Sequence, residues 1–265
     1  MNRRVELLVA TMHQTDFSKV EEMNIRSDAV FANQADRQEY REAVIDGYRI
    51  RMVTTDQRGV GRNRNLALLY AEAEYVLFAD DDMVYADDYA EQIVRAFEEL
   101  PQADIILFTL AFTKNGQIFD RTSHPLRKIP YLKSWKYGTC VIAARREKLE
   151  RANIWFHLQF GGGCKYTAGE DSLFLRDCYS KGLTVYTHPY TLGFCKKDSS
   201  TCFSGFTEKY FLDKGCWLSL ALPKTCRLAV LPLAYKWRNL NPEFGFGKTA
   251  RLMWQGISDF RSGNR

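Results

Sequence analysis

Five short apolar runs, separated by segments of helical character, constrain the fold of this chain more than any other feature of its sequence. The runs are nearly continuously apolar and rich in β-branched and aromatic residues, as strands covered on both faces should be. Strands that alternate with helices predict an α/β fold with a mostly parallel, Rossmann-like sheet flanked by helices. The runs are VELLVA (5–10), DAVFAN (28–33), YRIRMVTT (48–55), EYVLFA (74–79) and ADIILFTL (103–110).

The clearest helical pattern is DDYAEQIVRAFEEL, at residues 87–100. Asp87 or Asp88 can cap its start, one of its faces is apolar, and Pro101 follows its end. In sheets of this kind, ligands bind beyond the carboxyl ends of the strands. Side chains that directly follow the predicted strands are therefore the first candidates for a functional site.

The pattern becomes looser after Phe112. We expect a turn at 114–117, a long basic and aromatic loop at 124–138, and a further strand at 139–146.

Two more elements complete the predicted order. The glycine-rich segment FGGGCKYTAGED (160–171) leads into a helix that begins at Glu170 or Asp171. The run LTVYTHP (183–189) is predicted as a last strand that ends on His188.

Length and composition place the chain in a broad class. Its 265 residues suit one α/β domain with an appendage better than two equal domains. Seven cysteines without a CxxC pair indicate reduced thiols rather than a disulfide framework or a zinc site. Arg3 and Arg4 are followed directly by the first predicted strand, which is unlike a signal peptide. We therefore expect a cytoplasmic protein.

Positive charge is concentrated at the C-terminal end. Residues 205–265 contain ten Lys or Arg against four Asp or Glu, a net charge of +6, whereas the whole chain carries +5. We divide the chain into a main domain, residues 1–204, and a basic, aromatic-rich helical tail, residues 205–265. The tail is interrupted too often to span a membrane, but it suits the anionic inner face of the cell membrane. Packing on the main domain, or contact with a second subunit in a homo-oligomer, explains the same pattern.

Three adjacent carboxylates, Asp80, Asp81 and Asp82, end the fourth apolar run in the sequence YVLFADDDMVY. Their mutual repulsion is unfavourable unless a cation neutralises them or water solvates them. A small group of hard oxygen ligands with open coordination positions suits Mg²⁺ or Mn²⁺ shared with a substrate diphosphate. A solvated turn is the weaker alternative, because the run is apolar up to Ala79.

A second candidate segment, TTDQRGVGRNRNLAL (54–68), places Arg58, Arg62 and Arg64 at the start of a predicted helix. Guanidinium groups and free backbone amides can bind phosphate or hold a nucleotide there. The segment is neither a P-loop nor a GxGxxG motif, which argues against an ATPase or a dehydrogenase.

The third candidate is Gly169-Glu170-Asp171, an acidic pair between a glycine-rich loop and a helix. One of these carboxylates can act as a general base in a cleft while the loop folds over a substrate. Helix capping by Asp171 is the alternative.

The order of these motifs resembles that of the family 2 glycosyltransferases of GT-A fold, over roughly residues 5–190. Bacterial enzymes of capsule or surface-polysaccharide assembly are the most similar members. Two departures concern the end of the first strand, where proline and asparagine are usual and His13 is left without a role, and Met83, which replaces a frequent fourth acid. The stretches that carry the resemblance are ATMH, RGVGRNRNLAL, FADDDMVYADD with its DxD pattern, and GGGCKYTAGEDSLFL.

The resemblance implies a nucleotide-sugar site. Arg64 stands at the arginine of the family's ARN pattern and would contact the nucleotide, with Arg58 nearby. The residues expected to border the base are Thr11, Asn33, Gln34 and Asp36.

The resemblance also assigns the acids. Asp80 would face the ribose and Asp82 would bind the Mn²⁺ or Mg²⁺ ion, with Asp80 as a second ligand. We group Asp81 with the nucleotide-binding residues, although it is a simple spacer in the alternative reading. His188 is a candidate metal ligand, because some related enzymes use a histidine on the strand after the acidic helix. A packed residue is its alternative role.

Asp171 matches the family's catalytic base, with Glu170 beside it. The expected function is that of an inverting, metal-dependent glycosyltransferase with a nucleotide-sugar donor, a UDP-sugar, and a saccharide or lipid-linked acceptor, and no nucleic acid is involved. A sugar nucleotidyltransferase would need a glycine-rich loop with a basic residue after the first strand, which ATMHQTDFSK lacks. A non-catalytic binding module of the same fold would have lost the acids that are present here.

Overall fold

The computed structural model describes residues 4–114, 117–119, 124–196 and 205–263. A single mixed sheet lies at its centre, in the order β3-β4-β2-β1-β5-β10-β7-β11-β6, while β8 pairs with β7 and β9 with β11. The strands are β1 (Val5–Met12), β2 (Asp28–Gln34), β3 (Glu39–Ile45), β4 (Tyr48–Thr55), β5 (Tyr75–Asp80), β6 (Met83–Tyr85), β7 (Ile105–Lys114), β8 (Gln117–Phe119), β9 (Arg127–Lys128), β10 (Ile142–Arg145) and β11 (Val185–Cys195).

The predicted α/β fold with a mostly parallel sheet is confirmed. Strands β4, β2, β1 and β5 run parallel to one another, and β7 runs parallel to β11. The short β10 is antiparallel between β5 and β7. The two edges of the sheet are also antiparallel, with β3 on β4 and β6 on β11.

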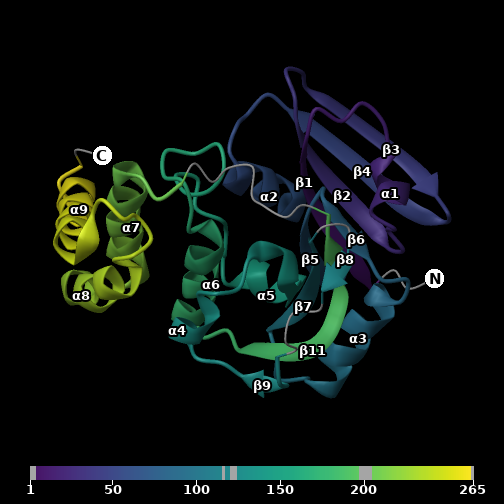
Figure 1. Cartoon of the computed structure of the whole chain (residues 1–265). Coiled ribbons are helices and arrows are strands. Elements are labelled where there is room, and N and C mark those ends of the chain that lie inside the picture. The colour runs from purple at the N-terminus through teal and green to yellow at the C-terminus, as the bar shows by residue number, and fades with distance from the viewer. Residues whose placement is uncertain (1–3, 115–116, 120–123, 197–204, 264–265) are drawn as a thin grey trace.

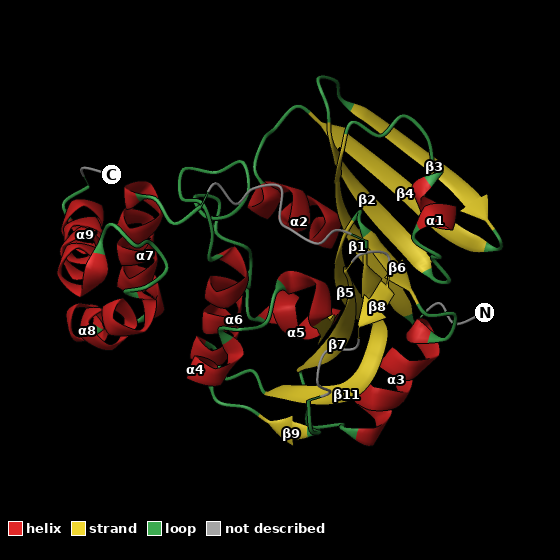
Figure 2. Cartoon of the chain, viewed as in Figure 1, coloured by secondary structure: helices red, strands yellow, loops and turns green. Residues whose placement is uncertain are grey.

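Helices cover both faces of the sheet (Figures 1 and 2). On one face, Ile93 and Phe97 of α3 join the core side chains of β1 and β5. On the other face, α2, α5 and α6 contribute Leu68, Leu149 and Phe174 to a second core cluster. The helices of this part are α1 (Lys19–Glu22), α2 (Val60–Leu69), α3 (Tyr89–Glu99), α4 (Tyr131–Ser134), α5 (Arg146–Arg151) and α6 (Glu170–Ser180).

The edge strand β3 is absent from the sequence prediction. It forms a hairpin with β4 through Asp46 and Gly47, which both adopt positive φ angles, of 51° and 83°. Its residues are mainly charged and exposed, as befits an edge strand, so it lacks the apolar run by which the other strands are recognised.

Three further expectations are corrected. The loop expected at 124–138 contains β9 and α4, and the segment 139–146 begins with a turn of 3₁₀ helix before β10. The last strand continues beyond His188 to Cys195. It does so because its pairing with β7 shifts register around Pro189, which has no amide hydrogen to donate. Lys114 and Gln117 pair across the predicted turn, and residues 115–116 lie outside the described part.

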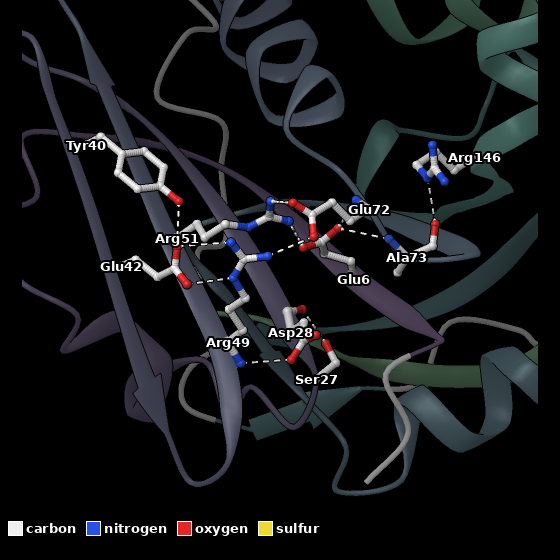
Figure 3. Close-up of polar contacts among 10 residues, drawn as sticks. All are labelled: Glu6, Ser27, Asp28, Tyr40, Glu42, Arg49, Arg51, Glu72, Ala73 and Arg146. Carbon is white, nitrogen blue, oxygen red and sulfur yellow. Dashed lines mark hydrogen bonds and ion pairs between the residues drawn. The ribbon is translucent and has the colours of Figure 1, made fainter.

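Buried charges tie the amino ends of the strands together (Figure 3). Glu6 on β1 and Arg51 on β4 are each 2% exposed and form an ion pair. Glu6 Oε2 also accepts a hydrogen bond of 2.7 Å from the amide of Glu72, and Arg51 Nη1 donates to Glu72 Oε1 at 2.7 Å. Arg49 extends the network to Glu42 on β3. This network lies at the end of the sheet opposite to the acidic turn.

The tail folds into α7 (Glu208–Ala221), α8 (Cys226–Trp237) and α9 (Gly245–Arg261). Gly215 and Gly256 let α7 and α9 approach so closely that a Cβ at either position would overlap backbone of the other helix. A third core cluster joins these helices to Phe160, Tyr166 and Leu173 of the main domain. Packing on the main domain is therefore one real use of the tail's apolar residues.

Two absences concern the described part of the chain alone. No helix in it is long and apolar enough to cross a membrane. Its cysteines are free thiols, and Cys202 lies outside it.

Candidate active site

The acidic turn lies at the carboxyl end of a central strand, as the sequence predicts. β5 ends on Asp80 between β1 and β10. Asp81 Oδ2 accepts a hydrogen bond of 2.6 Å from Oγ1 of Thr11, near the carboxyl end of β1. Asp81 therefore links two parallel strands and is more than a spacer, and this bond satisfies one of the three adjacent charges.

Arg64 connects the acidic turn to the second acidic pair. Its Nη2 donates to Asp80 Oδ1 at 2.9 Å, and its Nη1 donates to Glu170 Oε1 at 3.0 Å. The guanidinium lies 5.5 Å from the ring centroid of Phe156, and the side chain is 5% exposed. Burial alone would lower the pKa of Arg64, but Asp80 and Glu170 outweigh burial and raise the pKa above its ordinary value. The acidic turn and the acidic pair, which are far apart in the sequence, are thus bound to the same guanidinium group.

The asparagines on either side of Arg64 explain its orientation. Asn63 Nδ2 donates to the carbonyl oxygen of Thr11 at 3.0 Å. The Asn65 side chain exchanges hydrogen bonds of 2.9 and 2.8 Å with the backbone of Phe156. Together they fix the first turns of α2 on both sides, so that Arg64 faces the acids.

Glu170 and Asp171 begin α6. Gly169, with φ of 117°, lies so close to Trp217 that a Cβ would be 2.5 Å from the Cδ1 atom of the indole. Asp171 Oδ1 accepts a hydrogen bond of 2.7 Å from the amide of Ser172. Burial, followed by the charge of Glu170, raises the pKa of Asp171 to about 6. Such a carboxyl group is ionised at neutral pH and is still basic enough to accept a proton.

The residues predicted beside the nucleotide base fall into two groups. Asn33 is fully buried and exchanges hydrogen bonds of 3.0 and 2.9 Å with the backbone of Gln14. Gln34 is buried as well. Asp36 and Arg58 form an ion pair at the surface. Asn33 thus holds the loop after β1, and contact of these residues with a nucleotide stays a prediction.

A model of the glycosyl transferase family 2 matches residues 29–161, half of the chain. The chain belongs to glycosyltransferase family 2. The matched segment contains Arg64 and the acidic turn but ends before Glu170 and Asp171.

Solved glycosyltransferases share the fold of this family member. S. aureus TarS residues 1–349, in complex with UDP-GlcNAc, aligns at a TM-score of 0.62 with 13% identity, over 98% of this chain and 92% of that one. The mannosyltransferase PcManGT from Pyrobaculum calidifontis, in complex with GDP-Man and Mn²⁺, aligns at 0.51 with 17% identity, over 98% and 73%. At these identities the likeness shows the GT-A fold. No curated protein matches the sequence.

The glycosyltransferase has hard oxygen donors for a metal ion at the acidic turn. The Asp80 side chain is 41% exposed, and Arg64 binds its Oδ1. Among the described residues, no group of three or more His, Cys, Asp or Glu is gathered as a metal site. An ion held by Asp80 and Asp82 would therefore have to complete its coordination with a diphosphate and water. Their assignment as ligands stays a prediction.

His188 is a packed residue of β11. Its ring centroid lies 5.2 Å from that of Phe108, and its Nδ1 accepts a hydrogen bond of 3.2 Å from the amide of Tyr190. Burial lowers the pKa of His188, and the charge that opposes this is Glu99, at the end of α3. These contacts match the alternative role, and none of them supports the predicted role as a metal ligand.

Lys214, on α7, is absent from the residues predicted from the sequence. Its ammonium nitrogen lies 5.3 Å from the ring centroids of both Tyr210 and Trp217. Burial lowers the pKa of Lys214, whereas Asp171 and Glu170 act in the opposite direction. The available signal was a lysine directly before the apolar and aromatic run GCWL, where a charged residue is unusual.

Proposed function

We propose that this enzyme transfers a sugar from a nucleotide-sugar donor, first of all a UDP-sugar, to a saccharide or lipid-linked saccharide during surface-polysaccharide synthesis. The observation that carries the proposal is the double ion pair of Arg64 with Asp80 and Glu170. Asp80 is expected at the donor and Glu170 beside the acceptor, and both are paired with Arg64. The complexes of TarS with UDP-GlcNAc and of PcManGT with GDP-Man support a nucleotide-sugar donor.

The donor half of the site would stabilise the leaving group. Cleavage of the bond between the sugar C1 and phosphate builds negative charge on the diphosphate. A Mn²⁺ or Mg²⁺ ion held by Asp82 and Asp80 would supply positive charge to the diphosphate oxygens. Arg64 remains protonated throughout because its pKa is raised, and Arg58 lies near the same strand ends.

The acceptor half would supply the base. Asp171 takes the proton from the acceptor hydroxyl as that oxygen attacks C1 on the face opposite to the diphosphate. A single displacement inverts the anomeric centre, so no second nucleophile is required. Glu170 is held by Arg64 and the amide of Gly169, and its charge raises the proton affinity of Asp171.

The test is incubation of the full chain with a panel of UDP-, GDP- and dTDP-sugars, with Mn²⁺, with Mg²⁺ and with EDTA. Release of the nucleoside diphosphate, in the presence of a metal, supports the proposal, and the anomeric configuration of a transferred sugar reports inversion. In a parallel incubation with added pyrophosphate, formation of a nucleoside triphosphate and a sugar 1-phosphate would indicate a sugar nucleotidyltransferase. Binding of a nucleotide sugar without any turnover would indicate a non-catalytic module of the same fold.

We also propose that the enzyme binds the inner face of the cell membrane through α8. Residues 222–242 contain four Lys or Arg and no Asp or Glu. On α8, Leu228, Leu231 and Tyr235 are 72%, 45% and 60% exposed, and their spacing of three and four residues puts them on one face. An apolar stripe with basic neighbours fits an anionic lipid surface. A lipid-linked acceptor would be reached from there.

A further inference from the structure

Helix α7 contacts the loop that carries the acidic pair. The Nε1 atom of Trp217 donates to Ser172 Oγ at 2.9 Å, and its ring covers Gly169. One turn earlier, Asp213 Oδ2 accepts hydrogen bonds of 3.1 Å from both the amide and the hydroxyl of Thr167. Side chains of α7 therefore hold residues 167–172 at two points.

Lys214 lies between these two anchors in the sequence of α7. Its ammonium group is flanked by the rings of Tyr210 and Trp217, and Trp217 is itself in contact with both neighbours of the acidic pair. Lys214 therefore lies beside the indole that contacts Gly169 and Ser172, and the charges of Asp171, Glu170 and Asp213 all favour its protonated form.

Asp171 faces charged groups from three helices. Glu170, on α6, disfavours its ionised form, whereas Arg64 of α2 and Lys214 of α7 favour it. Arg64 already forms ion pairs with Asp80 and Glu170. Gly138, from the segment before the 3₁₀ turn, approaches Asp171 without a charge. Lys214 therefore differs from Arg64, the other cation that favours ionised Asp171, because Arg64 is also paired with Asp80.

We propose that Lys214 is a positioning residue of the transfer reaction, whose ammonium group offsets the charge of Glu170 and keeps Asp171 ionised as the proton acceptor. The inference rests on the proposed role of Asp171 as the base. It makes α7 part of the active site, so the C-terminal helices are required for more than attachment. Without Lys214, burial and Glu170 would retain a proton on Asp171 at a higher pH.

The first test needs no substrate. Carboxyl-carbon-labelled aspartate is followed by NMR during a pH titration, and the Asp171 signal is assigned by its absence in Asp171→Asn. We expect Lys214→Met to raise the apparent pKa of Asp171 by about one unit, and Lys214→Arg to leave it near the wild-type value. Lys248→Met is the matched control, since it removes the same charge from a 43% exposed position of α9. An Asp171 pKa that is equal in Lys214→Met and wild type overturns the inference.

The second test follows UDP release from UDP-N-acetylglucosamine, or from the donor that the panel selects, between pH 5 and 9. The apparent pKa of the acidic limb of the kcat/KM profile should be higher in Lys214→Met than in wild type. In Lys214→Arg it should lie near the wild-type value. A loss of activity that is equal at every pH would mean that Lys214 is merely structural, and would refute the inference. If Lys214→Met does not fold, Lys214→Gln gives the same comparison. Absence of turnover in wild type would instead contradict the proposed function and leave the titration to judge Lys214.

Discussion

At the scale of single residues, the raised pKa of Asp171 links function to stability. Its folded-state pKa, about 6, lies above the ordinary value of 3.8, so the folded protein binds this proton more tightly than the unfolded chain. The resulting stabilisation is fully present below pH 3.8 and is lost as the pH rises through about 6. At neutral pH the buried carboxylate is therefore a cost to folding.

Asp171→Asn should therefore abolish transfer and stabilise the protein at pH 7.5, because the amide carries no charge to bury. We expect a gain of about 2 kcal/mol in the free energy of unfolding, measured by urea denaturation. The gain should shrink as the pH falls from 6 to 4. Asp259→Asn, at a half-buried position near the end of α9, serves as the control. A variant that retains activity, or one equally stabilised at both pH values, contradicts this prediction.

Arg64 offers a second test at this scale. Lysine at this position keeps the charge but lacks the planar fork that reaches Asp80 and Glu170 together. We expect Arg64→Lys to lower kcat/KM by roughly 100-fold, a loss of about 3 kcal/mol in transition-state stabilisation. Arg62→Lys, an exposed neighbour on the same helix, should lie within about twofold of wild type. Equal kinetics for the two variants would remove Arg64 from the site.

The sequence predicted the acids and Arg64 because each belongs to a local motif at the end of a strand or the start of a helix. It missed Lys214, whose role depends on how α7 packs against α6 across more than forty residues of chain. It also gave no sign that the buried amide of Asn33, predicted beside the nucleotide base, holds the backbone of Gln14. A side-chain type does not tell which of its neighbours it will bind.

At the scale of elements, the buried ion pair between Glu6 and Arg51 joins β1 to β4 across β2 (Figure 3). Arg51→Met should lower the free energy of unfolding by about 3–5 kcal/mol, because Glu6 is left charged and buried. Glu6→Met combined with Arg51→Met should recover much of this loss. Urea denaturation measures both, and binding of UDP, far from this end of the sheet, should be unchanged in the double variant. A single variant as stable as wild type refutes the argument.

The elements that the sequence predicts well share a physical property. Strands β1, β2, β4, β5 and β7 are buried on both faces, so each has an apolar run that can be read directly. β3 stays hidden because one of its edges meets water, and β9 because it has two residues. β11 runs through Pro189 only by shifting its pairing with β7. Whether a segment forms an edge strand or an irregular strand depends on the strands beside it more than on its own sequence.

At the scale of the whole molecule, the three C-terminal helices have two sides. Their inner side packs on Phe160, Tyr166 and Leu173 and reaches the acidic pair through α7. The outer side includes the exposed stripe of α8, and Figure 1 shows α9 on the side of α7 away from the sheet and α8 across one end of both helices. If both proposals hold, the boundary at residue 204 does not separate catalysis from attachment, since α7 would serve the first and α8 the second.

This arrangement decides how membrane binding must be tested. Removal of residues 205–265 would also remove Trp217 from Gly169 and Ser172, so point substitutions on α8 are required. Leu228→Glu combined with Tyr235→Glu should lower co-sedimentation with phosphatidylglycerol vesicles by at least about tenfold at 0.1 M salt, because it adds charge where apolar contact is needed.

Val44→Glu is the matched control for this experiment. Val44 is also 72% exposed, like Leu228, but lies on β3 at the far edge of the sheet. It should bind the vesicles as wild type does, and all variants should release UDP from a soluble donor at the wild-type rate. Since basic residues attract the protein to anionic lipid, wild-type binding should weaken with salt and be small on phosphatidylcholine. If the α8 double variant binds as well as Val44→Glu, the exposed stripe does not contact the membrane, and contact with a second copy of the chain becomes its explanation.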